Sequence, residues 1–240
     1  MEPVGKGGQG VEVTLVIPAY REEENLRLLL PRVLEVLRAT GRSHEVLVVD
    51  TVAPTDATAE VCAAAGARCV ARSPTNVYGD AVRTGIREAR GEWIAFMDAD
   101  GSHAPDVLAR LLAEAPPADV VVGSRYVEGG YTENPWILQL MSRVVNLCYT
   151  LVLGLPIQDV SNSFKVYRGA WLRELSLRCD NFDVIEEMVF KLHRRHRAAR
   201  FREVPMAFRK RMFGATKRNL VAFMVSYLVT LLRLRFMGDD

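Results

Sequence analysis

Two aspartates separated by one residue, Asp98 and Asp100, follow an apolar run that ends at Met97. Carboxylate oxygens at this spacing can hold one hard cation, Mg²⁺ or Mn²⁺, which also binds substrate phosphates. Such a cation would neutralise charge on a departing diphosphate. Acidic pairs also occur in solvated turns after strands, so the spacing alone leaves both interpretations open.

Two further acidic side chains follow other apolar runs. Glu22 lies in the loop PAYREEEN after the β-branched run 11–17, and Asp50 follows the run 45–49. Open α/β sheets bind ligands at the carboxyl ends of their strands. We therefore expect Glu22, Asp50 and the Asp98/Asp100 pair to face one crevice.

The elements that must position these acids alternate along the chain. The patterns predict strands over 11–17, 45–49, 68–71, 93–97 and 119–123, and helices over 26–37, 57–65, 79–89 and 105–114. This alternation predicts an α/β fold with a mostly parallel sheet flanked by helices. From about residue 130 the alternation stops, and an apolar helical segment (135–154), a loop-strand segment (156–168) and a helix (182–197) follow.

Composition predicts an ordinary globular chain. Its 240 residues carry 31 Lys and Arg against 29 Asp and Glu, but residues 191–218 are strongly basic. That basic stretch favours phosphates, an anionic membrane or a solvated helix face. The cysteines show no metal-binding spacing and indicate free thiols in a reducing compartment. Residues 1–10 show no signal peptide and are expected to form a flexible tail.

The segment 220–236 is the apolar stretch that comes nearest to a membrane span. Its uncharged part stops at Leu232, which is too short for crossing, so we predict no transmembrane helix. Basic residues precede the uncharged run 220–232, and Arg233 and Arg235 follow it, as in a helix lying at a membrane surface. A core helix or a dimer helix is the competing interpretation.

Six segments carry a resemblance to a known family. They are VIPAYREEENL (16–26), EVLVVDTVAPTDAT (45–58), GDAVRTGIREARGEWIAFMDADGSHAP (79–105), VVGSRY (121–126), DVSNSFKVYR (159–168) and EVPMAFRKRMFGATK (203–217). In this order they resemble the family-2 glycosyltransferases, most closely the branch of dolichyl-phosphate mannose synthases and polyprenyl-phosphate glycosyltransferases. The resemblance implies a GT-A fold over 11–217, with a donor half (11–125), an acceptor half (126–217) and a terminal amphipathic helix (218–240).

The resemblance also implies an activity and roles for single residues. The activity is transfer of a hexose, mannose or glucose, from a GDP- or UDP-linked donor to a polyprenyl or dolichyl phosphate, with inversion. The donor residues that match are Pro18, Tyr20, Glu22, Val49, Asp50, Asp98, Ala99 and Asp100, with Arg211 and Lys217 from the closing loop RMFGATK. Asp100, Arg125, Arg211 and Lys217 would act in catalysis, and Mg²⁺ or Mn²⁺ would be the cofactor.

Four motifs depart from the family pattern. Thr51 replaces a second acid, Lys165 replaces an arginine, and the stretch 76–80 lacks the usual glycine and lysine pattern. The metal motif continues with Gly101-Ser102-His103, so the third ligand would be the neutral oxygen of Ser102 or a water. These changes predict a divergent subgroup with an altered donor or acceptor.

The acceptor determines whether a general base is needed. A lipid monophosphate is already largely anionic at neutral pH and needs cations to hold it, whereas a sugar or alcohol needs a base. Arg125, Arg143 and Lys165 are the predicted acceptor-binding residues, and Arg168 and Arg211 are further cations in the second half. Asp159 and Glu187 are the candidate bases, and each could equally be a structural carboxylate.

Three functions therefore compete. The first is transfer to a polyprenyl phosphate by a cytoplasmic protein that is peripheral on the inner face of the membrane, with or without a membrane-anchoring partner subunit. The second is transfer to a soluble or glycan acceptor with a carboxylate base. The third is a non-catalytic nucleotide-sugar-binding partner subunit. A nucleotidyltransferase is disfavoured because PAYREEEN holds no glycine, and nucleic-acid binding because no aromatic platform interleaves the cations.

Overall fold

The computed structural model describes residues 10–213 and 220–236, with side chains from 226 onward in the second range. The predicted tail, apart from Gly10, and the predicted site residue Lys217 lie outside these ranges.

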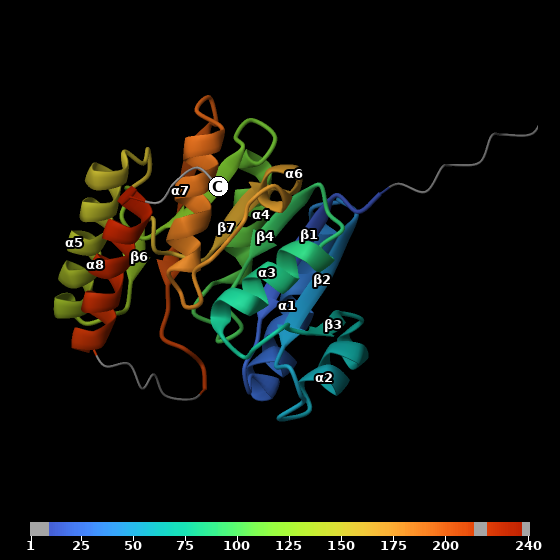
Figure 1. Ribbon diagram of the computed structural model, residues 1–240. Coiled ribbons are helices and arrows are strands. Elements are labelled where there is room, and N and C mark those ends of the chain that lie inside the picture. The colour runs from blue at the N-terminus through green and yellow to red at the C-terminus, as the bar shows by residue number, and fades with distance from the viewer. Residues whose placement is uncertain (1–9, 214–219, 237–240) are drawn as a thin grey trace, which may run out of the picture.

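Within the described residues, seven strands form one twisted sheet in the order β3-β2-β1-β4-β7-β5-β8 (Figure 1). Their bounds are β1 Val13–Pro18, β2 His44–Asp50, β3 Arg68–Ala71, β4 Trp93–Phe96, β5 Val120–Ser124, β7 Lys165–Arg168 and β8 Phe201–Pro205. Every neighbouring pair is parallel except that β7 is antiparallel to both β4 and β5. The predicted α/β fold with a mixed, mostly parallel sheet is confirmed. Because β7 lies between β4 and β5, both halves of the chain contribute to one sheet.

Two layers of helices bury the faces of this sheet. One face packs against α1 (Glu23–Ala39), α2 (Thr58–Ala65) and α4 (Pro105–Glu114). The other packs against α3 (Tyr78–Glu88), α5 (Trp136–Leu153), α6 (Gly169–Arg173), α7 (Val184–Arg195) and α8 (Leu220–Phe236). Strand β1 explains the need for both layers, because Leu15 and Ile17 enter the first core while Val16 enters the second. A strand buried on both faces reads as a continuous apolar run.

One close approach between a helix layer and the sheet falls at a glycine. A Cβ on Gly85 of α3 would lie 2.4 Å from a Val16 methyl carbon, so only glycine lets α3 pack this near β1. Pro31 lies inside α1 without ending it.

Helices α5 and α8 lie side by side at one end of the sheet (Figure 1). Tyr149 of α5 donates its hydroxyl to the carbonyl of Tyr227 on α8 at 2.9 Å. Thr230 of α8 donates to Asp183, just before α7, also at 2.9 Å. These bonds and the buried Leu231 and Leu234 attach α8 to the protein body. A short parallel sheet of β6 (Tyr131–Thr132) and β9 (Ala207–Phe208) joins the start of α5 to the segment that precedes α8.

Candidate active site

The carboxyl ends of β1 and β2 are joined by backbone contacts that arrange the first predicted donor loop. Ala19 donates its backbone N–H to the Val49 carbonyl at 2.9 Å. The side chains of Pro18 and Val49 are buried, whereas that of Tyr20 is 51% exposed. Burial raises the pKa of Asp50, at the end of β2.

Arg72 connects these loops, although the sequence did not single it out. Its Nε donates to the Asp50 carbonyl at 3.0 Å, its Nη1 to the Asn76 carbonyl at 3.2 Å, and its Nη2 to the Ala19 carbonyl. A buried guanidinium whose donors all end on backbone carbonyls fixes loop geometry. Sequence offered no signal for this role, because an arginine directly after a short strand is common on surfaces.

The turn after β4 presents the predicted aspartate pair. Ser163 donates its hydroxyl to Asp98 Oδ1 at 2.9 Å, and the Asp98 N–H donates to His103 Nδ1 at 3.1 Å. The other ring nitrogen of His103 donates to Asn162 Oδ1 at 3.1 Å. Burial lowers the pKa of His103, which agrees with a neutral ring that accepts at Nδ1. His103 and Ser163 therefore hold Asp98 in place, and both roles were missed because they depend on packing against β7.

The basic segment 209–213 lies over this turn. Arg209 donates its N–H to the Ser102 carbonyl and Met212 donates its N–H to the Asp100 carbonyl, both at 2.9 Å. Gly101 has a φ of +76°, and a Cβ there would lie 2.5 Å from the Met212 side chain. A glycine is required on both counts.

Arg211 brings the closing loop onto the first strand end. Its Nη2 lies 2.9 Å from Glu22 Oε1, so two predicted donor residues far apart in sequence form an ion pair. Burial raises the pKa of Glu22, while its hydrogen bond from Asn25 and the charge of Arg211 oppose that shift. Lys217, the second predicted cation of this loop, lies outside the described residues.

The aspartate pair fits a divalent cation that shares its coordination with a ligand. Asp100 Oδ1 accepts the Ser102 N–H at 3.0 Å, and both aspartate side chains are partly exposed at the strand end. Ser102 Oγ is buried and has no hydrogen-bond partner among the described residues. Those residues contain no group of three or more His, Cys, Asp or Glu side chains that could hold a metal ion alone. Two carboxylates that rely on substrate phosphate and water for the remaining ligands are typical of Mg²⁺ sites.

The predicted acceptor cations divide into two kinds. Arg125 is 9% exposed, and its guanidinium donates two hydrogen bonds to Asp159, at 2.8 and 2.6 Å. Lys165 is fully buried, and its Nζ donates to the carbonyls of Val160, at 2.9 Å, and Asn162. Arg143, in contrast, is exposed on α5 and has no ion pair among the described residues. Its guanidinium lies 4.6 Å from the ring centroid of Tyr126, whose other neighbour is Arg125 at 4.9 Å.

Comparison with known proteins assigns the chain to a family. The family described as glycosyl transferase family 2 matches residues 14–176, which include the Asp98–Asp100 turn and β7. The chain belongs to glycosyl transferase family 2.

Curated relatives of this glycosyltransferase agree with that assignment. The undecaprenyl-phosphate mannosyltransferase of Micrococcus luteus is 34% identical over 87% of this chain and 88% of its own. The polyprenol monophosphomannose synthase of Mycolicibacterium smegmatis is 34% identical over 85% and 80%. The dolichol-phosphate mannosyltransferase of Pyrococcus furiosus is 29% identical over 86% of this chain, which spans 59% of that longer relative.

Solved structures confirm the fold of the glycosyltransferase. Glucosyl-3-phosphoglycerate synthase of Mycobacterium tuberculosis, in complex with phosphoglyceric acid, superimposes with a TM-score of 0.72 at 17% identity, over 95% of this chain and 81% of the other. The same enzyme in complex with Mn²⁺, uridine diphosphate and glucosyl-3-phosphoglycerate matches over 99% and 88%, also with a TM-score of 0.72.

The two candidate bases of the glycosyltransferase are structural carboxylates. Asp159 is fully buried and neutralises Arg125, as described above. Glu187 is fully buried on α7, accepts the backbone N–H groups of Arg178 and Cys179, and lies 2.9 Å from Lys191 Nζ. A general base must reach the proton that it removes. Neither carboxylate is free to meet an acceptor hydroxyl.

Hydrogen bonds hold the loop after Asp50, in which Thr51 stands where the family usually has a second acid. Thr51 donates its hydroxyl to the Ala53 carbonyl at 2.6 Å, and Val52 donates its N–H to Asn76 Oδ1 at 2.8 Å. Thr51 thus closes the turn after β2. Asn76, from the stretch 76–80 that also departs from the family pattern, supports the same turn. Both departures from the family pattern thus contribute hydrogen bonds to the same turn.

One apolar helix was underestimated from the sequence. Among the described residues, α5 is long and apolar enough to cross a membrane by length and composition, and only 22% of it is buried. From the sequence, 220–236 is the apolar stretch that comes nearest to a span. Periodic polar residues such as Gln139, Arg143 and Asn146 concealed the apolar stripe of α5.

Proposed function

We propose that this glycosyltransferase transfers a hexose, mannose in particular, from a nucleotide sugar to a polyprenyl phosphate at the cytoplasmic surface of a membrane. The relatives named above act on undecaprenyl, polyprenol and dolichol phosphates, which supports the acceptor class. The observation that carries the proposal is the position of Arg143. Arg143 has no ion pair among the described residues, contacts the ring of Tyr126 beside Arg125, and lies on α5 among its exposed apolar side chains.

The donor is proposed to lie across the carboxyl ends of β1, β2 and β4. Tyr20, Glu22 and Asp50 would contact the nucleoside, while Asp98 and Asp100 would hold Mg²⁺ or Mn²⁺, with Ser102 as a third oxygen. A divalent cation held there would neutralise charge on the leaving diphosphate. Arg211 lies 2.9 Å from Glu22 at the same strand end. With segment 209–213 over the donor, Arg211 would add a second positive charge beside the leaving diphosphate.

The acceptor supplies a nucleophile that needs no base. A phosphate oxygen attacks the anomeric carbon, the new carbon–oxygen bond forms as the bond to the nucleoside diphosphate breaks, and the nucleoside diphosphate leaves with the electron pair. One in-line displacement inverts the configuration at that carbon. Because Asp159 and Glu187 are occupied by structural partners, the described residues suit a phosphate acceptor better than a hydroxyl acceptor.

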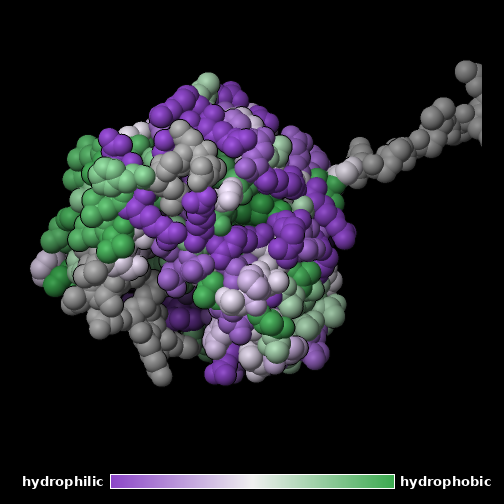
Figure 2. All heavy atoms as spheres, viewed as in Figure 1, coloured by the Kyte–Doolittle hydropathy of each residue, from purple (hydrophilic) through white to green (hydrophobic). Residues whose placement is uncertain are grey.

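The membrane contact is proposed to involve the outer faces of α5 and α8. Exposed apolar side chains recur along α5 at helical spacing, at Trp136, Ile137, Leu140, Val144, Leu147 and Leu151. Figure 2 shows hydrophobic side chains gathered over α5 on the left of the molecule. Helix α5 is proposed to lie in the interface rather than to cross it, because its opposite face is bound to the body. There, Asn146 Nδ2 donates to Ser161 Oγ at 3.0 Å, and Thr150 donates to the Ile157 carbonyl at 2.8 Å.

A transfer assay tests this function. Radiolabelled sugar from GDP-mannose, GDP-glucose, UDP-glucose and UDP-galactose would be offered with undecaprenyl phosphate in detergent, or with phosphoglyceric acid as a soluble acceptor. Metal-dependent label in the lipid phase from one donor is the expected result, with GDP-mannose first. Transfer to the soluble acceptor alone would replace the lipid proposal. Binding of a donor without transfer to either acceptor would favour the non-catalytic subunit.

A further inference from the structure

A row of ring contacts runs from the turn after β4 to helix α5. His103 packs edge-on against Phe208 of β9, with ring centroids 5.6 Å apart. The Arg125 guanidinium lies 5.5 Å from the centroid of the Phe208 ring and 4.9 Å from that of Tyr126. The Tyr126 ring in turn contacts the guanidinium of Arg143 on α5 at 4.6 Å. One aromatic ring therefore contacts both a buried and an exposed guanidinium.

The two guanidinium groups on Tyr126 differ in what else holds them. That of Arg125 is bonded to Asp159 and also donates from Nη2 to Ser161 Oγ at 3.1 Å. The guanidinium of Arg143 forms neither an ion pair nor a hydrogen bond within the described ranges 10–213 and 220–236. The Tyr126 ring is the cation–π partner that orients it. Arg125 is thus fixed by a carboxylate, and Arg143 by an aromatic ring.

A ring contact suits a cation that must meet an anion. An exposed arginine has many rotamers, and it loses that freedom when it binds a ligand. A contact that already orders the side chain lowers this cost, because the ordering precedes binding. An aromatic ring orients the guanidinium without the negative charge of a carboxylate. The charge of Arg143 therefore stays available to phosphate oxygens, which arginine binds through charge-assisted hydrogen bonds.

The neighbours of Arg143 on α5 suit a phosphate that carries an apolar chain. Leu140 and Leu147, three residues before and four residues after it, share its helix face and are 53% and 57% exposed. A phosphate on Arg143 would thus place an attached prenyl chain over apolar side chains. Tyr126 itself is held beside the end of β5, where its backbone N–H donates to Ser124 Oγ at 3.3 Å.

We propose that Tyr126 is a positioning residue for the acceptor, and that its ring holds the Arg143 guanidinium in place for the phosphate of the polyprenyl chain. This inference rests on the proposed function, because it takes Arg143 as the group that meets the acceptor phosphate. Tyr126 acts through Arg143 and makes no contact of its own with the reacting atoms.

Acceptor kinetics of Tyr126→Leu and Tyr126→Phe test the proposal. Initial rates would be measured at saturating donor and varied undecaprenyl phosphate. Leucine removes the ring, so the acceptor KM should rise about fivefold, the scale of one exposed cation–π contact. The kcat and the donor KM should stay within about twofold of wild type, because neither the donor site nor the metal site is altered. Phenylalanine keeps the ring and should restore the wild-type acceptor KM.

The double variant Tyr126→Leu/Arg143→Gln separates positioning from a direct contact. If Tyr126 acts through Arg143, the double variant should show the same rise of about tenfold as Arg143→Gln alone. A rise near fiftyfold would mean that Tyr126 acts independently and would overturn the proposal. An unchanged acceptor KM in Tyr126→Leu, or equal rises in the leucine and phenylalanine variants, would overturn it as well.

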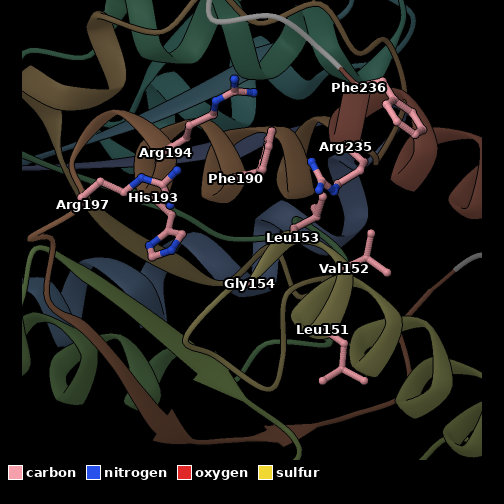
Figure 3. A pocket seen from close by; sticks show the side chains of 10 residues that line it. All are labelled: Leu151, Val152, Leu153, Gly154, Phe190, His193, Arg194, Arg197, Arg235 and Phe236. Carbon is pink, nitrogen blue, oxygen red and sulfur yellow. The ribbon is translucent and has the colours of Figure 1, made fainter.

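The matched control is Arg197→Gln. Arg197 is an exposed cation at a hollow of about 610 Å³ beside the C-terminal end of α5, and no predicted donor, acceptor or metal residue lines that hollow (Figure 3). Its loss removes the same charge at a distance from Tyr126 and should change neither the acceptor KM nor kcat. Thermal midpoints near that of wild type confirm that the variants are folded.

A binding experiment without turnover separates this proposal from the proposed function. The ring current of Tyr126 should shift the NMR signal of the Arg143 Nε–H away from that of Arg197, and Arg143→Gln identifies the signal by its loss. Titration with geranyl phosphate, a short prenyl phosphate, should move it further. An unshifted signal in wild type would overturn the positioning role whether or not Tyr126→Leu folds. Absent transfer in all proteins, with a shifted signal that responds to geranyl phosphate, would reject the proposed reaction alone.

Discussion

The acidic rim and the buried charge cluster of this protein use the same residue types in opposite ways. The acidic rim comprises Glu22, Asp98 and Asp100, and the buried charge cluster comprises Arg125, Asp159, Lys165, Glu186 and Glu187. Rim carboxylates stay partly exposed and are fixed by N–H and O–H donors from neighbouring turns. Cluster charges are almost fully buried, and Arg125, Asp159, Lys165 and Glu187 are bonded to protein groups.

The difference lies in what the surroundings leave unsatisfied. A carboxylate held through one oxygen at a strand end keeps lone pairs for a cation or a ligand hydroxyl. A buried ion pair has no capacity left, and removing one partner leaves an uncompensated charge. Substitutions at the rim should therefore affect catalysis, and substitutions in the cluster should affect folding.

Asp100→Asn is the substitution expected to have the largest effect. It removes a charge that would hold the cation on the donor diphosphate but retains Oδ1 for the Ser102 N–H. We expect kcat to fall by at least about 100-fold, the scale for loss of a group that stabilises transition-state charge. The thermal midpoint should stay within a few degrees of wild type, as measured by differential scanning calorimetry.

The matched control for this substitution is Asp106→Asn. Asp106 is an exposed carboxylate in the first turn of α4, a short distance along the same segment. Its loss should leave kcat within about twofold, because a single surface charge near a helix terminus is worth 0.3–1 kcal/mol to stability rather than to chemistry. Full, metal-independent turnover by Asp100→Asn would reject the rim as a metal site.

Asp159→Asn should have the largest effect on stability. The substitution leaves the Arg125 guanidinium buried beside a neutral amide, and the expected loss is about 3–5 kcal/mol in the free energy of unfolding. Urea denaturation measures this loss. A double substitution, Arg125→Met/Asp159→Leu, should recover much of it, since the buried charge is then absent. If Asp159→Asn unfolds like wild type but transfers no sugar, Asp159 belongs to the chemistry rather than to the scaffold.

The acidic rim could be predicted from sequence because its position follows from topology. Asp50 and Asp98 each end an apolar strand, and parallel strands bring their carboxyl ends to one edge. The structure places Glu22 beside Arg211 and Asp100 beneath Met212, as a loop closing over the donor end requires. The resemblance of RMFGATK to the family loop predicts that this segment lies near the donor residues, but the Glu22–Arg211 ion pair itself was not predicted.

The buried charge cluster could not be predicted in the same way. The position of Lys165 depends on β7 lying between β4 and β5, which no local pattern specifies. From sequence alone, a lysine that binds an acceptor phosphate cannot be told from one that, like Lys165, donates to two backbone carbonyls. The apolar stripe of α5 was overlooked for a related reason, because an apolar helix facing a core and one facing lipid share their periodicity.

Arg143→Gln tests whether the exposed cation differs from its buried neighbours. We expect the KM for polyprenyl phosphate to rise about tenfold, the scale of one charge-assisted hydrogen bond, with kcat and the donor KM little changed. Initial rates at varied acceptor concentration measure the split. Arg32→Gln, an exposed arginine of α1, serves as the control and should change neither constant. A fall in thermal midpoint instead of a rise in acceptor KM would place Arg143 with the cluster.

Glu186→Gln should have the smallest effect, and it appears as a dependence of stability on pH. Burial raises the pKa of Glu186 to about 8, with the charge of Lys165 opposing and that of Asp183 adding to the shift. Burial likewise lowers the pKa of Lys165 to about 8. The folded protein thus keeps Glu186 protonated at pH values where the unfolded chain ionises it.

The sign of this effect follows from linkage. A carboxyl whose folded pKa is raised contributes stability that is fully present below its ordinary pKa, near 4.5, and is lost as the pH rises towards about 8. Glutamine cannot ionise, so the midpoint of Glu186→Gln should rise relative to that of wild type steadily between pH 5 and pH 8. Lys165 would add its own slope only above about pH 8, where its folded and unfolded forms differ in protonation.

The adjacent Glu187→Gln separates this effect from general damage to α7. Glu187 accepts the N–H groups of Arg178 and Cys179 and pairs with Lys191, so its amide variant should lose stability at every pH in the same range. Thermal midpoints of both variants and wild type at intervals from pH 5 to pH 8 make the comparison. Parallel curves for Glu186→Gln and wild type would show that Glu186 is ionised in the folded protein. Glu186 would then join Asp159 and Glu187 as a charged carboxylate of the buried cluster, and the cluster would differ from the acidic rim in burial and pairing.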